Sequence, residues 1–312
     1  MPNYKIITDS CCDLPVEKIR ELDLTVVSLD LMFRGETRKD AVTDDIKEVY
    51  DALRAGESAT TSAVNPEGWK GAMEPALKEG KDALVLTFSS GLSTTYQSAV
   101  IAADELKETY PHRTINVVDT LCASLGQGLL VWLAAQKRDA GMSLAELTAW
   151  VEDNKQNICQ WFTVDDLMYL KRGGRISATT ALVGTMLKIK PVLHVDAEGH
   201  LVNVGKVRGR KASIDALVAK MGQLAIDGYK ELVTICHGDC LEDAEYLAKK
   251  LKEDYGVKEV FIGYTGAVIG SHSGPAPWPC SSWARKDDIG DTSRAFRGVS
   301  FPSLLLAIGR SI

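Results

Sequence analysis

Hydroxyl and acidic side chains follow three of the apolar runs in the first half of the chain. The runs end in Thr8-Asp9-Ser10, in Ser89-Ser90 and in Asp119-Thr120. If these runs are parallel strands, their carboxyl ends share one edge of a sheet, which is where α/β proteins bind ligands. The sequence therefore predicts a polar rim of hydroxyls and backbone amides at that edge, with Ser10 as one member.

The segment Ser89–Ser93 is the strongest candidate for an anion site. It joins a buried run to a predicted helix, so the first amides of that helix lack partners within it. Free N–H groups and the helix dipole attract negative charge, and the Ser93 hydroxyl can donate one more bond. Ser90, Gly91 and Thr94 would complete the rim. Simple capping of the helix by Ser93 is the competing interpretation, and from spacing alone it comes first, because serine caps are common.

A serine nucleophile is a sharper alternative. The hydrolase elbow has the pattern G-x-S-x-G, and residues 91–95 read G-L-S-T-T, without the second glycine. Dinucleotide and P-loop glycine patterns are absent from the sequence. His272 lies among small residues at 270–274, which let a ligand or backbone come close. A lone histidine is more often a structural hydrogen-bond donor than a catalyst.

The composition is that of an ordinary globular chain with an acidic balance. It has 312 residues, of which 45% are hydrophobic and 25% charged, and its formal charge is −6. Phosphate contacts need clustered Lys and Arg, so nucleic-acid binding is a poor prediction. Seven cysteines without paired spacing indicate reduced thiols rather than disulfides or a metal site. Because no signal-like or membrane-spanning run is present, we expect a cytoplasmic protein.

One segment carries a local excess of positive charge. Between Lys171 and Lys211 there are nine basic and two acidic residues, a local charge of +7, so the remainder carries −13 (−6 minus +7). A solvated basic face is one interpretation. A docking patch for an acidic partner or for phosphate is the other, and the size of the contrast tilts the choice toward it. The candidate docking residues are Arg172, Arg175, Arg208 and Arg210.

The order of elements predicts an α/β fold of two domains. Apolar runs at 5–8, 24–32, 83–88 and 114–118 alternate with helical patterns at 43–54, 94–109 and 123–140. This alternation is typical of a parallel sheet covered by helices. From about residue 160 the pattern changes, and strands at 193–195, 201–204, 232–236 and 259–263 predict a smaller α/β unit. We expect domains at 1–158 and 159–275.

Several segments, in one order from residue 4 to 275, together resemble the DegV family. They are Ile7–Ser10 with Asp13–Pro15, Thr60–Ser62, Ser89–Ala99, Leu170–Ile176 with Leu187–Pro191, Lys206–Lys211, and Ile269–Pro275. After Ser62 the chain departs from the Gln-Pro-Ser that is usual in the family. The block Leu170–Ile176 with Leu187–Pro191 is the most specific of these segments.

The resemblance implies a bacterial fatty-acid-binding protein with a long acyl chain in the cleft between two α/β domains. In the best understood members this protein is the lipid-carrying subunit of a fatty acid kinase, and a separate kinase subunit phosphorylates the bound carboxylate with ATP. It implies that Thr61 and Ser93 hydrogen-bond the carboxylate, that His272 is a further contact, and that Arg208 or Arg210 faces the kinase.

On this interpretation the chain is an acyl carrier without a cofactor and without catalysis of its own. It would touch the membrane only transiently, for lipid exchange. Two alternatives stay open. One is a hydrolase or kinase-like enzyme that uses Ser93 or His272 covalently, and the other is a regulatory module that works through the basic segment.

After Pro275 the resemblance stops. The family continues with an apolar strand, whereas residues 276–285 read A-P-W-P-C-S-S-W-A-R, and such a stretch of Trp and Pro is a poor strand. Restoring one base before codon 276 and regrouping the codons permits G-T-M-A-L-F-F-L-G-K, the expected family ending. We interpret residues 276–312 as an out-of-frame tail, which predicts that the final core strand is missing.

Sequencing of the source gene tests this interpretation of the tail. We expect the DNA around codon 275 to lack one base relative to a frame that encodes the family ending. An intact frame through residue 312 contradicts the frameshift.

Overall fold

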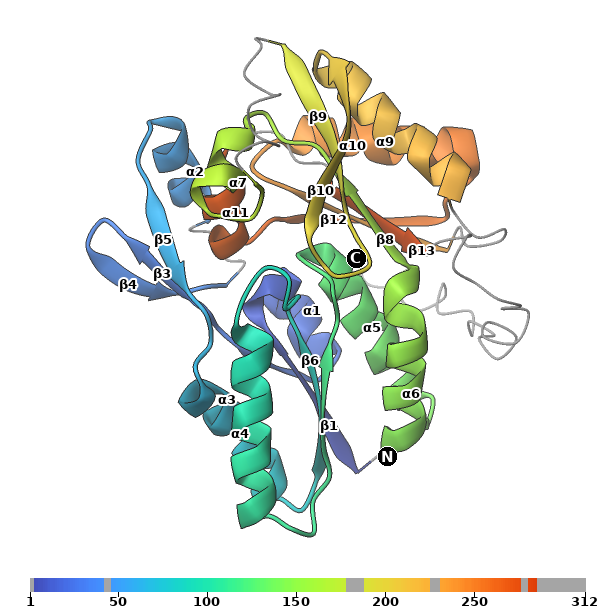
Figure 1. The fold of residues 1–312 in the computed structure, drawn as a ribbon. Helices are drawn as coiled ribbons and strands as arrows, with labels where there is room; N and C mark the ends of the chain where they lie inside the picture. Colours follow the sequence, from blue (N-terminus) through green and yellow to red (C-terminus); the bar gives the residue numbers. More distant parts are fainter. Residues whose placement is uncertain (1–2, 42–45, 178–187, 225–230, 276–279, 285–312) are drawn as a thin grey trace, which may run out of the picture.

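The computed structural model describes residues 3–41, 46–177, 188–224, 231–275 and 280–284, and its first layer is a four-stranded sheet (Figure 1). All strand pairs in this sheet are parallel, in the order β2-β1-β6-β7. The strands are β1 (Tyr4–Asp9), β2 (Leu24–Val27), β6 (Asp82–Thr87) and β7 (Ile115–Asp119). The parallel sheet predicted for the first half of the chain is confirmed.

Helices cover both faces of this sheet, since its central strands are apolar on both sides. Ile6 and Leu84 pack toward α5 and α6, whereas their neighbours Ile7 and Val85 pack toward α3 and α4, as the two-residue period of a strand requires. The elements around the sheet are η1 (Ser10–Cys12), α1 (Val16–Glu21), α3 (Pro66–Lys78), α4 (Thr95–Thr109), α5 (Leu125–Asp139), α6 (Leu144–Asn154) and η2 (Lys155–Asn157).

A small antiparallel sheet projects from the first layer beside helix α2 (Ile46–Arg54). Its order is β4-β3-β5, with β3 (Asp30–Phe33), β4 (Glu36–Lys39) and β5 (Ala59–Ser62). Along β5 the burial alternates, so that Thr61 is half-buried while Thr60 and Ser62 are exposed. The sheet therefore directs the Thr61 side chain inward.

The second large sheet has six strands in the order β10-β9-β8-β13-β11-β12. Only β11 and β12 pair in parallel, and the other pairs are antiparallel. The strands are β8 (Ile158–Phe162), β9 (Ile189–Val195), β10 (Leu201–Arg208), β11 (Leu232–His237), β12 (Glu259–Tyr264) and β13 (Cys280–Ala284). The helices of this half are α7 (Leu167–Arg172), α9 (Arg210–Leu224), α10 (Leu241–Tyr255) and α11 (Ala267–Ser273).

Helix α5 lies between the two large sheets (Figure 1). Residues 125–132 are buried all around the helix, and the Thr234 hydroxyl of β11 donates to the Leu125 carbonyl at 3.0 Å. Two glycines of α5 allow the helix to approach its neighbours closely. A Cβ on Gly126 would overlap the Gln160 side chain, and a Cβ on Gly128 would lie 2.5 Å from the carbonyl oxygen of Cys12.

The prediction of a missing final strand is wrong. Residues 280–284 form β13, which pairs with β8 on one side and β11 on the other, in the middle of the sheet. Two neighbouring strands offer hydrogen-bond partners on both edges, and this environment outweighs the poor local propensity of the segment. Residues 276–279 and 285–312 lie outside the described residues. The frameshift and the domain limits stay predictions.

Within the described ranges no helix is both long and apolar enough to cross a membrane.

Replacing Gly128 with alanine should destabilise the fold. Alanine favours a helix by about 1 kcal/mol over glycine, but its methyl group would press on the Cys12 carbonyl, and such overpacking costs roughly 1–3 kcal/mol. We expect a lower urea midpoint for Gly128→Ala. Gly71→Ala in α3 is the matched control, because nothing lies within 4 Å of its added Cβ. An equal or higher midpoint for Gly128→Ala contradicts this packing.

Candidate ligand-binding cavity

A cavity of about 450 Å³ lies between the carboxyl end of the parallel sheet and the second large sheet. This volume is within the usual range for small-molecule sites. Eleven of its twenty lining residues have apolar side chains, among them Phe88, Phe162 and Leu170. The remainder include Thr61, Ser93 and other polar residues, so the cavity suits a ligand with an apolar body and a small polar end.

The Thr61 hydroxyl and the His272 imidazole meet at the cavity wall. Thr61 Oγ1 lies 2.7 Å from His272 Nε2, although the two residues are 211 positions apart. Thr61 comes from β5, and His272 comes from the last turn of α11. The structure therefore brings together two of the three residues that the resemblance assigns to the carboxylate.

The His272 imidazole is neutral at physiological pH. Burial, and then the positive charge of Arg175, lower the pKa of His272 from 6.5 to about 4. A neutral imidazole has one N–H donor and one acceptor nitrogen. If Nε2 carries the hydrogen and donates to Thr61, the Thr61 hydroxyl keeps its own hydrogen for a ligand.

Ser93 lines the cavity at the turn between β6 and α4, and it also supports the start of that helix. Its Oγ accepts from the Thr95 amide at 3.2 Å and lies 2.8 Å from Thr95 Oγ1. When the fully buried Thr95 hydroxyl donates, the Ser93 hydroxyl is left with a hydrogen for a ligand. The capping role and the ligand role are therefore compatible.

The amides at 90–93, between β6 and α4, are hydrogen-bonded, so a row of free amides does not begin before the helix. The amide of Ser90 donates to Asp119 Oδ1, that of Gly91 to Ser89 Oγ, and those at 92 and 93 to the Ser89 carbonyl. Of the amides at 90–95, that of Thr94 is the one for which the described structure shows no hydrogen bond. Ser90 and Thr94 line the cavity, so the polar rim consists mainly of hydroxyls.

Ser10 and Gly91 do not line the cavity. The Ser10 side chain is buried, and its hydroxyl accepts from the Leu29 amide at 3.1 Å. Gly91 faces the turn of the β9–β10 hairpin, where an added Cβ would lie 2.8 Å from the Gly199 backbone. Both residues position neighbouring segments, and we remove them from the predicted rim.

Arg175 lies in the cavity wall, not on a docking surface as predicted. Its Nε donates to the Leu92 carbonyl at 3.2 Å, and its Nη1 donates to the Gly173 carbonyl. It follows the Gly173-Gly174 turn after α7, and it lies close enough to His272 to lower the pKa of that ring. A half-buried guanidinium supplies the positive charge that the sequence analysis did not place in the site.

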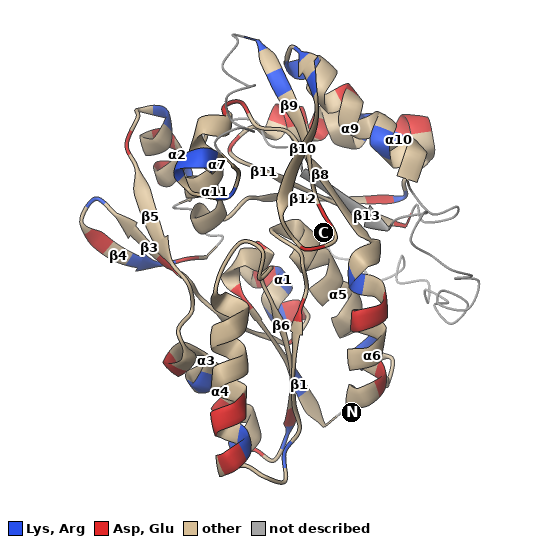
Figure 2. Ribbon diagram, viewed as in Figure 1, with Lys and Arg blue, Asp and Glu red and all other residues tan. Residues whose placement is uncertain are grey.

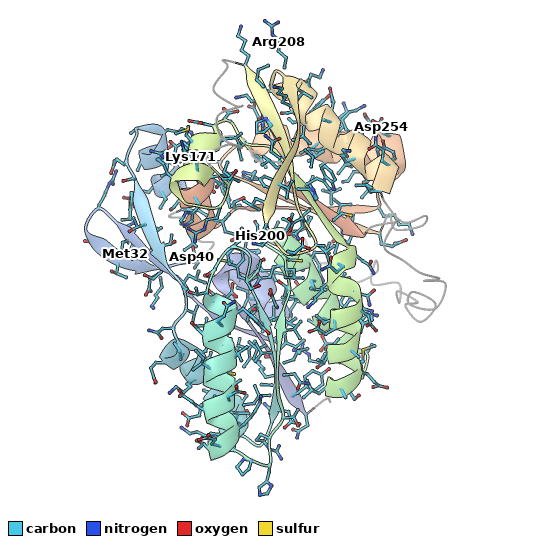
Figure 3. All side chains as sticks on the ribbon, in the orientation of Figure 1. Met32, Asp40, Lys171, His200, Arg208 and Asp254 are labelled. Carbon is cyan, nitrogen blue, oxygen red and sulfur yellow. The ribbon has the colours of Figure 1, made fainter. Side chains whose placement is uncertain are left out.

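The other predicted docking residues lie apart. Arg172 is exposed and stacks over the Tyr169 ring at 4.4 Å, and Arg208 is exposed at the end of β10. Figure 2 shows basic residues on α7 and at the outer end of the β9–β10 hairpin, and Figure 3 labels Lys171 and Arg208 there. Arg210 is half-buried and pairs with Asp243 at 3.0 Å. The basic segment is therefore divided between separate places.

The β9–β10 hairpin closes one side of the cavity. Val195 and Leu201, which flank its turn, line the cavity, and the Ser89 hydroxyl donates to the Gly199 carbonyl at 2.9 Å. Figure 3 labels His200 in this turn, above the end of the parallel sheet. The sequence analysis missed this role, because a hairpin turn carries no local sign of the surface that it covers.

The contacts do not assemble a nucleophile and base from Ser93 and His272. Ser93 bonds to Thr95 and His272 bonds to Thr61, and the described part of the chain shows no hydrogen bond between Ser93 and His272. Among the described residues, no group of three or more His, Cys, Asp or Glu could hold a metal ion.

The family model described as "Uncharacterised protein, DegV family" matches residues 3–280. A DegV domain-containing protein of Clostridium perfringens is 44% identical over 276 residues, which cover 88% of this chain and 95% of that protein. Among solved structures, a DegV family protein of Thermus thermophilus reported to bind fatty acid has 32% identity and a TM-score of 0.80, covering 90% of this chain and 99% of that one.

A DegV lipid-binding protein of Thermotoga maritima has a TM-score of 0.81 and 30% identity, with coverage of 91% of this chain and 99% of that one. The family model extends over both large sheets and the cavity between them, as far as the start of β13. By sequence and by fold, the chain belongs to the DegV family.

Proposed function

We propose that this protein binds a long-chain fatty acid in the cavity and presents its carboxylate to a separate kinase. The observation that carries the proposal is one apolar cavity whose wall holds hydroxyls, a neutral imidazole and a half-buried guanidinium. The similarity to DegV proteins of Thermus thermophilus and Thermotoga maritima, reported to bind fatty acid or lipid, supports the same ligand class.

The acyl tail supplies most of the affinity. Each methylene that leaves water for an apolar wall contributes about 0.8 kcal/mol. Phe88, Phe162 and Leu170 are buried and face the cavity, as do the half-buried Val195 and Leu201 of the hairpin. A ligand without a long apolar chain would leave these walls in contact with water, so a short carboxylic acid is a poor candidate.

The head group needs both charge and hydrogen bonds. A carboxylate in an apolar cavity is costly unless donors meet it, and each charge-assisted bond contributes about 1.5–3 kcal/mol. The Thr61 and Ser93 hydroxyls provide such donors, with His272 behind Thr61. Arg175 balances the negative charge. The neighbouring carbonyls of Leu92 and Gly173 fix the direction of its guanidinium.

A separate kinase agrees with a site whose contacts pair neither Ser93 nor His272 with the other as nucleophile and base. A carrier only has to present one carboxylate oxygen, which attacks the γ-phosphorus of ATP on the kinase, and ADP leaves. We assign the docking role to the exposed Arg208, with Arg172 as a second candidate, because Arg210 is held by Asp243. Since the kinase uses ATP, this proposal places the protein in the cytoplasm, with transient membrane contact for lipid exchange.

Replacement of both hydroxyls should weaken ligand binding strongly. We expect Thr61→Val with Ser93→Ala to raise the Kd for palmitate at least about a hundredfold, since two bonds to a charged group are lost. Calorimetric titration measures the change. Native mass spectrometry of the freshly purified wild type should show a bound mass that matches a fatty acid.

Thr60→Val is the matched control for this test. It makes the same substitution on the same strand, but Thr60 is exposed and points away from the cavity. We expect its Kd to stay within about twofold of the wild type. A double variant that binds palmitate as tightly as Thr60→Val contradicts the proposed head-group site.

The buried neutral His272 makes stability depend on pH. The pKa in the folded state is about 4, below the ordinary 6.5, so its contribution is present above pH 6.5 and is lost as the pH falls toward 4. Between pH 7 and pH 5 we expect the wild type to lose about 2 kcal/mol more stability than His272→Gln. Urea unfolding at both pH values measures the difference, and parallel losses would refute it.

A further inference from the structure

Helix α11 carries His272, and it depends on the rest of the protein to stay helical. It has seven residues, and its N-cap Gly266 provides no side-chain hydrogen bond. A helix this short is not stable by itself, and its first amides need acceptors from elsewhere. Groups that hold the start of α11 therefore determine where its last turn lies.

The carboxylate of Asp40 holds that start. Its Oδ1 accepts from the Val268 amide at 3.2 Å, across 228 residues of sequence. Asp40 is 2% exposed, and its own amide donates to the Leu29 carbonyl at 2.9 Å, which fixes it at the end of β4. Figure 3 labels Asp40 where the small sheet approaches α11. A negative charge at a helix N-terminus also interacts favourably with the helix dipole.

The same small sheet holds the other end of the helix. β3 pairs with β4 on one side and with β5 on the other, and Thr61 lies opposite Leu31 in that register. Val268 and His272 are four residues apart, which is one helical turn or about 6 Å. The sheet thus contacts α11 twice, through Asp40 at the first turn and through Thr61 at the last.

Neighbouring side chains on the remaining sides of α11 leave the helix little room to shift. A Cβ on Gly266 would overlap Asp13 Oδ1, and a Cβ on Gly270 would lie 2.7 Å from Tyr50 Oη. The charged or titratable groups that face the helix include Asp40 and Asp13 at its start, Tyr50 along its side, Tyr169 at its C-cap, and Arg175 near His272.

We propose that Asp40 is a positioning residue for the head-group site: its carboxylate fixes the first turn of α11 so that His272 meets Thr61. This inference rests on the proposed function only in its consequence for ligand binding. The position of His272 itself is measurable in the ligand-free protein, so the two can fail separately.

The test compares Asp40→Ala, Asp40→Asn and Asp40→Glu by NMR titration of the His272 ring in the ligand-free protein. Asparagine keeps an acceptor oxygen in place, whereas alanine removes it and glutamate displaces it. We expect the pKa of His272 to rise by at least about one unit in Asp40→Ala, because a loosened helix end admits water. Loss of the negative charge alone would lower that pKa, so the direction of the shift separates the two causes.

Palmitate affinity is the second readout. We expect about a tenfold higher Kd for Asp40→Ala, and a value within about threefold of the wild type for Asp40→Asn. Ser143→Ala is the matched control: it removes the capping box of α6, a helix that carries no cavity residue, and costs comparable stability. It should change neither the His272 titration nor the Kd.

Several outcomes would overturn the inference. One is an unchanged or lowered His272 pKa in Asp40→Ala, and another is an equal effect of Ser143→Ala. If Asp40→Ala does not fold, the other two variants decide: a positioning role predicts Asp40→Asn near the wild type and Asp40→Glu shifted, and the reverse order refutes it. If wild-type protein does not bind palmitate, the proposed function fails, while the His272 titration still judges the role of Asp40.

Discussion

The hydrogen bond between Thr61 and His272 connects two parts of the protein that lie far apart in the sequence. One partner lies on an edge strand of the small sheet and the other on a helix near the end of the described chain. The bond can form only if β5 and α11 are both in place, so the head-group site depends on the packing of both halves. Because the imidazole is buried and neutral, it can support a hydroxyl without adding charge to the cavity.

The distribution of charge around the cavity distinguishes a carrier from a catalyst. A hydrolase needs a base next to its nucleophile, and a histidine whose pKa is far below neutrality and whose Nε2 faces a threonine is poorly placed to activate Ser93. One guanidinium, fixed by two carbonyls, instead supplies a positive charge in the cavity wall. Under the proposed function, such a site holds an acid and leaves its chemistry to another protein.

The sequence alone predicted the strands and helix starts that local residue patterns determine. The apolar runs that became β1, β6 and β7 have both faces buried, and the helix after Ser93 begins where its sequence indicates. Arg175 was misplaced because a basic run looks the same whether its members face solvent or a cavity, and only the turn at Gly173-Gly174 redirects this one. The amides at 91–93 bond to Ser89 in the same turn, whereas that of Ser90 depends on Asp119 from another strand. No local pattern reveals such tertiary partners.

The position of β13 has a consequence for biosynthesis. The parallel sheet is complete once residue 119 has been translated, whereas β8 and β11 are joined only through a strand at 280–284. A nascent chain therefore carries a finished first layer while the second layer still has two unpaired inner edges. Unpaired edges attract other strands, and late closure is slow because it joins distant segments. The ribosome-bound chain is thus exposed to misassembly until β13 has been made, which is the stage at which a chaperone would protect it most.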